Sequence, residues 1–339
     1  MKVLNFFISL LIGVGLLVWI IQFVGWLEIK SAFLIFTGWQ GIIIVLLTFL
    51  LLFVGSWKWQ VILKSLGHNL SHRQLLPPYL VGFSMNYLFQ MIIVGGEIFR
   101  TYILKEKYAV PWKKAVSSVI IDKILEVTCF ILSVLAGLAF FIFKIGLPSG
   151  DIALIIGGFL FLLTAAIGFF YFKSFKKESI AKPLANFFRY KGLPNGDILE
   201  IEKETFSFFK LKKIAFWQGL GLASLRVAIT WLRVWVLILF LGKGIGFLSS
   251  LSVLGFAYIA MGIPIPADLG VHEAIQVFAF NALGLGAGAA PAFAMIQRGA
   301  QLIIAFIGII IFFKLGMGLF QAILFRKLDR LIGNKNNQT

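Results

Sequence analysis

The sequence predicts an all-α polytopic membrane protein with about seven or eight transmembrane helices and one or two re-entrant or broken segments. Composition is the first observation. Hydrophobic residues make up 60% of the 339 residues and charged residues only 13%, whereas about 25% of the residues of a soluble domain are charged. The second observation is that the apolar residues gather in runs of about 20 or more, the length that crosses the hydrocarbon core. Both indicate a bundle of helices embedded in a bilayer.

The net charge of +17 comes mainly from lysines and arginines that lie in a few loops. In a soluble protein this excess would suggest nucleic-acid binding. In a membrane protein, basic loops mark the cytoplasmic side. We therefore expect a multi-pass protein of the cell (cytoplasmic) membrane with both termini in the cytoplasm, and no nucleic-acid partner.

The cysteine count and the absence of metal-ligand spacings in the sequence limit which disulfides and metal sites the chain can form. Cys129 is the only cysteine, so no disulfide can form within the chain, and its apolar surroundings predict a small core residue. We expect no metal site and no cofactor.

Four apolar runs in the first half of the chain are predicted to be simple spans. Residues 3–24 are too long for a signal-peptide core and are expected to be an uncleaved first span. Residues 39–63 are the second span, and Lys58 near its end predicts a snorkelling side chain at the interface. Residues 115–143 and 152–172 are two further spans.

Residues 75–96 are apolar enough to cross the membrane, but both flanks are basic. A simple crossing would place one basic loop outside, against the positive-inside rule. A re-entrant segment that enters and leaves on the cytoplasmic side resolves the conflict, with Pro77, Pro78, Gly82, Gly95 and Gly96 as possible break points. A crossing is the alternative.

A polar linker, residues 173–213, follows the N-terminal half. Within it, Asp197 can cap a helix that has Ile201 and Phe208 on one face. We expect this helix to lie on the cytoplasmic membrane surface.

Four apolar segments follow the linker. Residues 214–241 and 291–313 are long enough to span. Residues 248–263 and 271–286 are either two short spans or a hairpin that enters from outside, and the charge rule does not separate these alternatives.

We expect one transmembrane domain, residues 1–325, before a basic cytoplasmic tail, residues 326–339. The domain divides into an N-terminal half (1–172), the linker, and a C-terminal half (214–325). Each half has a Gly- or Pro-broken apolar segment followed by a carboxylate. Interrupted segments at corresponding places in two halves point to the binding site of secondary transporters, and entry from opposite faces would suit an inverted repeat.

Charged residues inside apolar segments are the candidates for a polar site. Each costs about 2.5–3.5 kcal/mol at the bilayer centre unless a partner or water compensates it. The candidate substrate-binding residues are Glu97, Arg100, Asp122, Glu126, Arg226, Arg233, Asp268, His272, Glu273 and Arg298. The backbone breaks expected to line the same site are Gly95, Gly96, Pro264, Pro266 and Gly270. The alternative interpretation is that these charges only form ion pairs that lock the helices together.

Spacing predicts several pairs. Asp122 and Glu126 lie four residues apart and share a helix face, so Arg226 or Arg233 is their natural partner, while Lys123 should point elsewhere.

Two further pairs follow from sequence position. Glu97 could pair with Arg100 three residues on, and Arg298 could face Glu273 across two antiparallel helices. His272 could titrate near neutral pH in a proton relay.

Three stretches together resemble the lysylphosphatidylglycerol synthase transmembrane, or flippase-like, family. They are VGGEIFRTYIL (94–104), VIIDKILE (119–126) and IPIPADLGVHEA (263–274), in the order and spacing of that family. Two departures stand out: Ala267-Asp268 replaces a glycine pair, and His272 stands where arginine is common.

The resemblance implies a polytopic domain that moves lipids between leaflets. We expect a lipid flippase or transporter for an anionic, aminoacylated, or polyprenyl- or glyco-lipid head group that passes through a polar intramembrane cavity. The alternative is a non-transporting scaffold that binds a lipid and presents it to a separate transferase. A lipid-modifying enzyme is not expected, because the chain shows no nucleophile dyad, metal cluster or phosphate loop.

Overall fold

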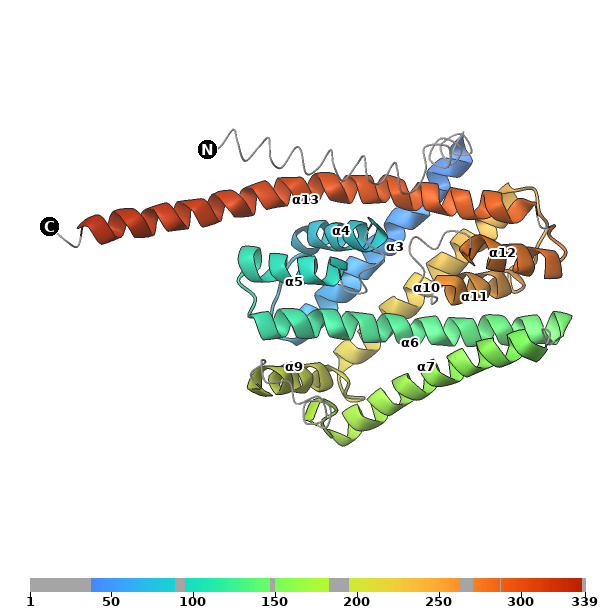
Figure 1. Cartoon of the computed structure of the whole chain (residues 1–339), viewed down its shortest axis with the longest axis horizontal. Helices are drawn as coiled ribbons and strands as arrows, with labels where there is room; N and C mark the ends of the chain where they lie inside the picture. The colour runs from blue at the N-terminus through green and yellow to red at the C-terminus, as the bar shows by residue number, and fades with distance from the viewer. Residues whose placement is uncertain are drawn as a thin grey trace.

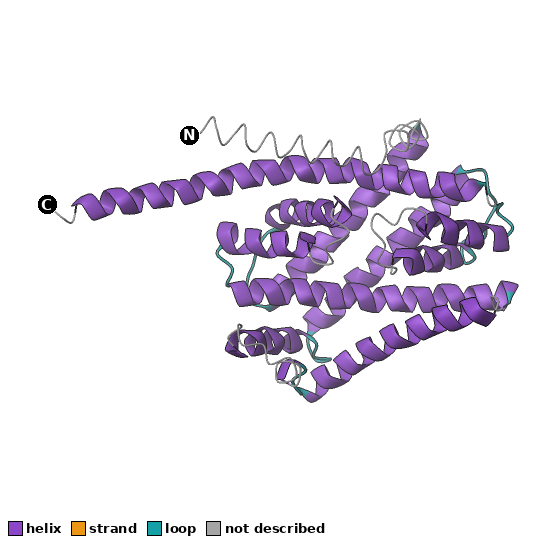
Figure 2. Ribbon diagram, in the orientation of Figure 1, coloured by secondary structure: helices purple, strands orange, loops and turns teal. Residues whose placement is uncertain are grey.

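The structure is a computed structural model that describes residues 38–88, 95–146, 150–182, 195–261, 271–286 and 288–336. The described residues form helices joined by loops, without a strand (Figure 2). The helices are α3 (Trp39–Ser65), α4 (His72–Leu88), α5 (Gly95–Tyr108), α6 (Trp112–Ile145), α7 (Gly150–Lys176), α9 (Asn195–Phe208), α10 (Ile214–Phe240), α11 (Ser250–Met261), α12 (Val271–Ala282) and α13 (Ala289–Asn336).

Four helices are long and apolar enough to cross a membrane: α3, α6, α10, and α13 as far as Leu315. They confirm the predicted apolar segments 39–63, 115–143, 214–241 and 291–313 as helices. Helix α7 covers the predicted segment 152–172. The predicted first span, residues 3–24, lies outside the described residues.

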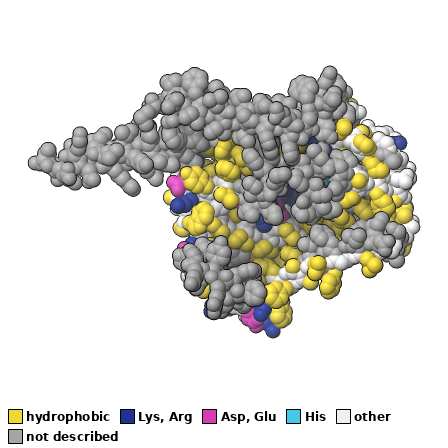
Figure 3. Space-filling view, in the orientation of Figure 1, with side chains coloured by type: hydrophobic (Ala, Val, Ile, Leu, Met, Phe, Trp, Pro, Cys, Tyr) yellow, Lys and Arg dark blue, Asp and Glu magenta, His cyan; other side chains and the backbone are white. Residues whose placement is uncertain are grey.

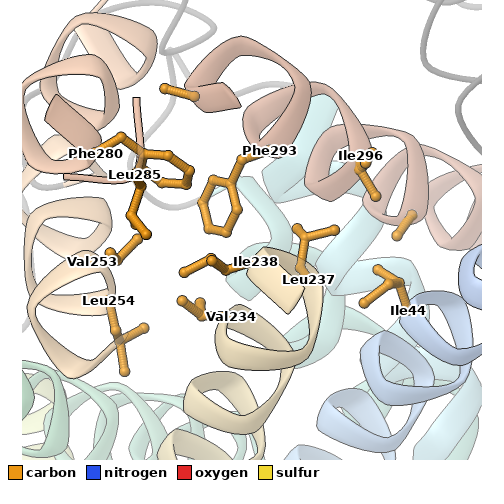
Figure 4. Packing of buried hydrophobic residues seen from close by; sticks show 12 residues of the cluster. Ile44, Val234, Leu237, Ile238, Val253, Leu254, Phe280, Leu285, Phe293 and Ile296 are labelled. Atoms are coloured by element: carbon orange, nitrogen blue, oxygen red, sulfur yellow. The ribbon is translucent and has the colours of Figure 1, made fainter. Parts of the chain in front are cut away.

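Helices α6 and α13 run along the long axis of the molecule, and α3 and α10 cross them (Figure 1). Helices α3 and α10 pack antiparallel. The rings of Trp39 and Phe240 meet with centroids 5.1 Å apart, and further along the pair Thr48 contacts Arg233. A hydrophobic cluster joins this end of α10 to α11, α12 and α13 (Figure 4).

Helices α4 and α5 form a short hairpin. At about 1.5 Å per residue they are about 25 and 21 Å long, shorter than a hydrocarbon core of about 30 Å. The Tyr108 hydroxyl at the end of α5 donates to the Gln74 carbonyl at the start of α4, at 2.9 Å. The start of α5 approaches the second half of α4 closely, because a Cβ on Gly96 would collide with the Gly82 carbonyl oxygen. The chain therefore enters and leaves this hairpin at the same end of the molecule.

The prolines do not break this hairpin where the sequence suggested. Pro77 and Pro78 lie inside α4, close enough to its start that only early backbone hydrogen bonds are lost. The helix continues to Leu88, and Gly95 and Gly96 begin α5.

Helices α11 and α12 form a second pair of short helices, each about 18 Å long. Their Phe256 and Phe278 rings pack with centroids 5.5 Å apart. Helix α11 starts near the end of α6, where Lys144 Nζ donates to Ser249 Oγ at 3.3 Å. It then runs back along α6, and Tyr258 reaches Phe130 with ring centroids 5.0 Å apart.

The two short pairs therefore approach the middle of α6 from opposite ends (Figure 1). Glycines permit the second approach, because a Cβ on Gly137 of α6 would lie 3.0 Å from the Cα of Gly255 of α11. The helix end at Met261 and the helix start at Gly95 both lie on the central side of their pairs.

Helix α9 forms as predicted within 173–213, but α6 covers its apolar face. The Ser117 hydroxyl of α6 donates to the Ile201 carbonyl at 3.1 Å, and Phe208 is fully buried. Asp197 lies in the first turn and pairs with Lys113 Nζ at 2.8 Å. The apolar face of α9 therefore packs on protein, and the position of this helix at the cytoplasmic membrane surface stays a prediction.

The described surface in Figure 3 is largely hydrophobic, and most of its charged side chains lie toward one end and along the lower edge. Exposed large apolar side chains are spread along α6 and α7, among them Phe143, Leu154 and Phe161. Such a surface is expected where lipid tails are the solvent. Cys129 is buried, as predicted, and its Sγ lies 3.7 Å from Ser224 Oγ.

Candidate functional site

A group of seven charged side chains from four helices meets where α3, α5, α6 and α10 come together. We name it the central ion network. Its members are Lys58 of α3, Glu97 and Arg100 of α5, Asp122, Lys123 and Glu126 of α6, and Arg226 of α10.

Asp122 holds two buried cations. Its Oδ1 lies 2.9 Å from Lys58 Nζ, and its Oδ2 accepts a hydrogen bond of 2.8 Å from Arg100 Nη1. All three side chains are at most 5% exposed. Charges removed from water to this degree are tolerated only when they are paired with good geometry.

The Arg100 guanidinium lies between two aromatic rings. Its Cζ is 4.1 Å from the ring centroid of Trp59 and 4.5 Å from that of Tyr79. Cation–π attraction of this kind is strongest away from water. The Trp59 ring is itself fixed, because its Nε1 donates to Ser118 Oγ at 3.1 Å.

Glu126 joins the network to α10. Its carboxylate forms an ion pair with Arg226, and the same oxygen lies 3.2 Å from Lys58 Nζ. The predicted Glu126–Arg226 pair is confirmed. The expectation that Lys123 points away from these carboxylates is wrong, because its Nζ lies 3.4 Å from the second Glu126 oxygen.

Glu97 ties the hairpin of α4 and α5 to the network. Its Oε1 accepts from Asn86 Nδ2 at 2.9 Å and pairs with Lys123 Nζ at 2.7 Å. Asn86 Oδ1 in turn accepts from the Gly96 backbone N–H at 2.7 Å. The predicted Glu97–Arg100 pair does not form, because Asp122 takes the arginine.

Lys58 was missed as a site residue. Flanking tryptophans suggested an interfacial lysine, yet its side chain is fully buried between Asp122 and Glu126. It lies seven residues before the end of α3, or about 10 Å from that end. Two carboxylates one turn apart on α6 need nearby cations, and that charge balance was the signal that could have placed Lys58 here.

One edge of the network is open. The side chains of Lys123, Arg226 and Glu126 are 43%, 28% and 21% exposed, whereas those of Lys58 and Asp122 are fully buried. Lys123 and Arg226 lie 11 and 12 residues into their helices, about 17–18 Å from the helix starts. Exposed charge at this depth of an apolar helix requires water or a polar partner.

The network also carries excess positive charge. Its four cations, Lys58, Arg100, Lys123 and Arg226, face three carboxylates. Among the described residues the network therefore has one more cation than carboxylates, and Lys123 and Arg226 lie at its exposed edge.

Arg233 lies outside the network. Its Nη1 donates to Thr48 Oγ1 at 2.9 Å, and the residue is only 5% exposed. Of the two alternative partners that the sequence left open, Arg226 forms the pair with Glu126, and Arg233 does not because it lies two turns further along α10.

The second broken segment is only partly described. Asp268, Pro264, Pro266 and Gly270 lie outside the described residues, as does the side chain of Glu273. His272 lies in the first turn of α12.

Arg298 lies in α13, where its carbonyl oxygen is 3.3 Å from the Tyr87 hydroxyl of α4. Its pairing with Glu273 stays a prediction. Over the described ranges, no group of three or more His, Cys, Asp or Glu side chains is placed to hold a metal ion.

Long apolar helices around buried ion pairs define a multi-pass membrane protein. The chain belongs to the family described as the lysylphosphatidylglycerol synthase TM region, whose sequence model matches residues 6–308. It is also similar to a UPF0104 membrane protein of Methanocaldococcus jannaschii, at 23% identity over 269 residues that cover 76% of this chain and 79% of that protein. No solved structure matches. The family predicted from the three sequence stretches is confirmed.

Proposed function

We propose that this protein is a lipid flippase or transporter that moves a phosphate-bearing head group past the central ion network. The observation that carries the proposal is the open, cationic edge of the network, at Lys123 and Arg226, well inside apolar helices. A lipid head group crossing the bilayer meets its main barrier in the hydrocarbon, where an unpaired charge is costly. Polar groups at that depth lower this barrier.

The chemistry of the edge suits phosphate. Arginine and lysine bind phosphate oxygens by charge-assisted hydrogen bonds, which are among the stronger ones in proteins. Arg226 can turn toward an incoming phosphate while Lys58 and Lys123 continue to balance Glu126. Glu97 and Glu126 offer carboxylates to the ammonium of an aminoacylated head group, so this class also fits.

We further propose that the pairs α4–α5 and α11–α12 are re-entrant segments that enter from opposite membrane faces. Their shortness and their approach to the middle of α6 support this, since broken helices meet near the midplane in many transporters. The basic residues Lys105, Lys113 and Lys114 gather at the open end of the α4–α5 hairpin, and the positive-inside rule places that end in the cytoplasm. With this orientation, both termini are cytoplasmic and the membrane is the cell membrane.

The proposed activity involves no covalent step and no cofactor. A non-transporting scaffold that hands a lipid to a separate transferase uses the same binding site, and only a transport measurement separates the two. The partners are membrane lipids in both cases.

The test is lipid movement by purified protein in liposomes. Trace fluorescent lipids with phosphatidylglycerol, aminoacyl-phosphatidylglycerol and phosphatidylcholine head groups are reconstituted, and dithionite quenches those in the outer leaflet. Transport predicts complete quenching of the charged-head-group lipids in protein-containing vesicles, faster than in protein-free ones. Binding of a head group without any movement, with or without an ion gradient, would establish the scaffold instead.

A further inference from the structure

Arg233 is a buried cation whose charge nothing balances in the described part of the chain. Its guanidinium donates from Nη1 to Thr48 Oγ1, and its buried Nε has no hydrogen-bond partner. No carboxylate of the described residues pairs with it. The Thr48 hydroxyl donates to the Ile44 carbonyl at 2.7 Å, so it offers Arg233 only a neutral acceptor.

This contrasts with the arginines of the central ion network. Arg100 and Arg226 each pair with a carboxylate. An arginine stays charged in a protein, and an uncompensated charge in a low-dielectric interior is strongly unfavourable. Arg233 is itself only 5% exposed, so leucine would fill its position at lower energy if packing were its only role.

Arg233 is placed to act after Arg226. It follows by seven residues, which is two turns or about 10 Å along α10, on nearly the same face. A head group released from Arg226 toward the opposite end of α10 would therefore meet Arg233 next.

We propose that Arg233 and Thr48 form a second anion subsite, which takes the phosphodiester group of an anionic lipid. The Thr48 hydroxyl can rotate to donate to a phosphate oxygen beside the guanidinium. The subsite is closed in this structure because both residues are buried, so anion binding there requires the helices around it to move apart. That the phosphate belongs to a lipid rests on the proposed function, whereas the need of Arg233 for an anion does not.

A purely structural role makes a different prediction. The Arg233–Thr48 hydrogen bond links α10 to α3. If this link is only structural, replacing either residue should not change the affinity of the protein for lipid. Anion binding, unlike tethering, must depend on ligand concentration, which makes equilibrium binding the measurement that separates them.

The experiment titrates the full chain, in a neutral detergent, with short-chain phosphatidylglycerol, short-chain phosphatidylcholine and inorganic phosphate. The readout is the dissociation constant from calorimetry, with the thermal midpoint as a second measure. Arg226→Gln is used as the background, so that the central network does not mask the second subsite. Arg233→Leu and the near-isosteric Thr48→Val are introduced into it, and the exposed Arg73→Gln is the control.

We expect Arg233→Leu to weaken phosphatidylglycerol binding roughly ten- to hundred-fold, the loss typical of a hydrogen bond to a charged group. Thr48→Val should weaken it less, and Arg73→Gln should leave it unchanged. Unchanged affinity in both Arg233→Leu and Thr48→Val would overturn the subsite. Binding of inorganic phosphate but not of phosphatidylglycerol would overturn the lipid assignment. Failure of the transport proposal would appear separately, as absent lipid movement by the wild-type protein.

Discussion

Replacing Asp122 by asparagine removes the carboxylate that balances two buried cations. Lys58 Nζ and Arg100 Nη1 lie 2.9 and 2.8 Å from its oxygens, and all three side chains are at most 5% exposed. Asparagine keeps the shape and one carbonyl acceptor but loses the charge. Glu126 lies 3.2 Å from Lys58 and compensates only in part, because Arg226 shares the same oxygen.

Removing one partner of a buried ion pair costs about 3–5 kcal/mol of unfolding free energy, because the other charge stays buried without compensation. We expect Asp122→Asn to fall in this range. Lys58→Met should cost less, about 1–3 kcal/mol, because Asp122 keeps Arg100 and Glu126 keeps Arg226. The geometry predicts that Asp122→Asn loses more unfolding free energy than Lys58→Met, whatever the absolute size of the two losses.

The assay is equilibrium unfolding by SDS in mixed micelles, followed by far-ultraviolet circular dichroism. Glu178→Gln is the matched control, since its carboxylate pairs with Lys173 at the surface, where the two side chains are 48% and 26% exposed. Exposed pairs of this kind contribute little. An Asp122→Asn variant as stable as Glu178→Gln, or more stable than Lys58→Met, would refute the assignment of Asp122 as the centre of the network.

Three further variants test packing and electrostatics by the same unfolding assay. Gly137→Leu should lower the free energy of unfolding by about 1–3 kcal/mol or more, because the added side chain overpacks the contact between α6 and α11. Gly158→Leu is the control and should have little effect, since no atom lies within 4 Å of its Cβ position. Equal effects of the two substitutions would contradict the α6–α11 contact. Trp59→Leu should lower the free energy of unfolding by about 1–2 kcal/mol more than Trp59→Phe, because phenylalanine keeps a ring over Arg100. Equal losses in the two variants would argue against cation–π stabilisation. Lys113→Gln should leave the transition unchanged, because its ion pairs are solvent-exposed; a clear loss would show that these pairs hold α9 in place.

The helices followed closely from the sequence. Apolar length alone placed both ends of α3, α6 and α10 and the start of α13 within a few residues, whereas α13 runs on to Asn336, beyond the predicted end at 313. Length and hydropathy decide whether a helix can span, so a single sequence carries that information. The same pattern could not predict that α4 and α5 fold back on each other, because that arrangement depends on contacts between distant residues, such as the one between Tyr108 and Gln74 across the hairpin.

The site was only partly predictable. Glu126 and Arg226 were paired correctly because both lie deep in apolar helices. Lys58 was misplaced because its neighbours in sequence describe an interface, whereas its position depends on how α3 crosses α6. The choice between Arg226 and Arg233 stayed open because the sequence gives the helical face of each arginine but not the depth at which α10 crosses α6.

Apolar periodicity on α9 raised a similar ambiguity. An amphipathic face can rest on a membrane or on another helix, and the pattern of Ile201 and Phe208 is the same in both cases. Burial of that face on α6 depends on tertiary packing, which the local sequence does not encode.

The proposed transport through the central ion network is tested most directly by the rate of phosphatidylglycerol movement in liposomes that contain Arg226→Gln. The exposed Arg73→Gln, which makes the same chemical change near the helix-loop boundary of α4, is the control. We predict that Arg226→Gln slows movement about ten-fold or more at unchanged folded content, because a charge-assisted contact to the phosphate is lost, while Arg73→Gln matches the wild type. Equal rates for Arg226→Gln and the wild type would contradict passage of the head group along this network.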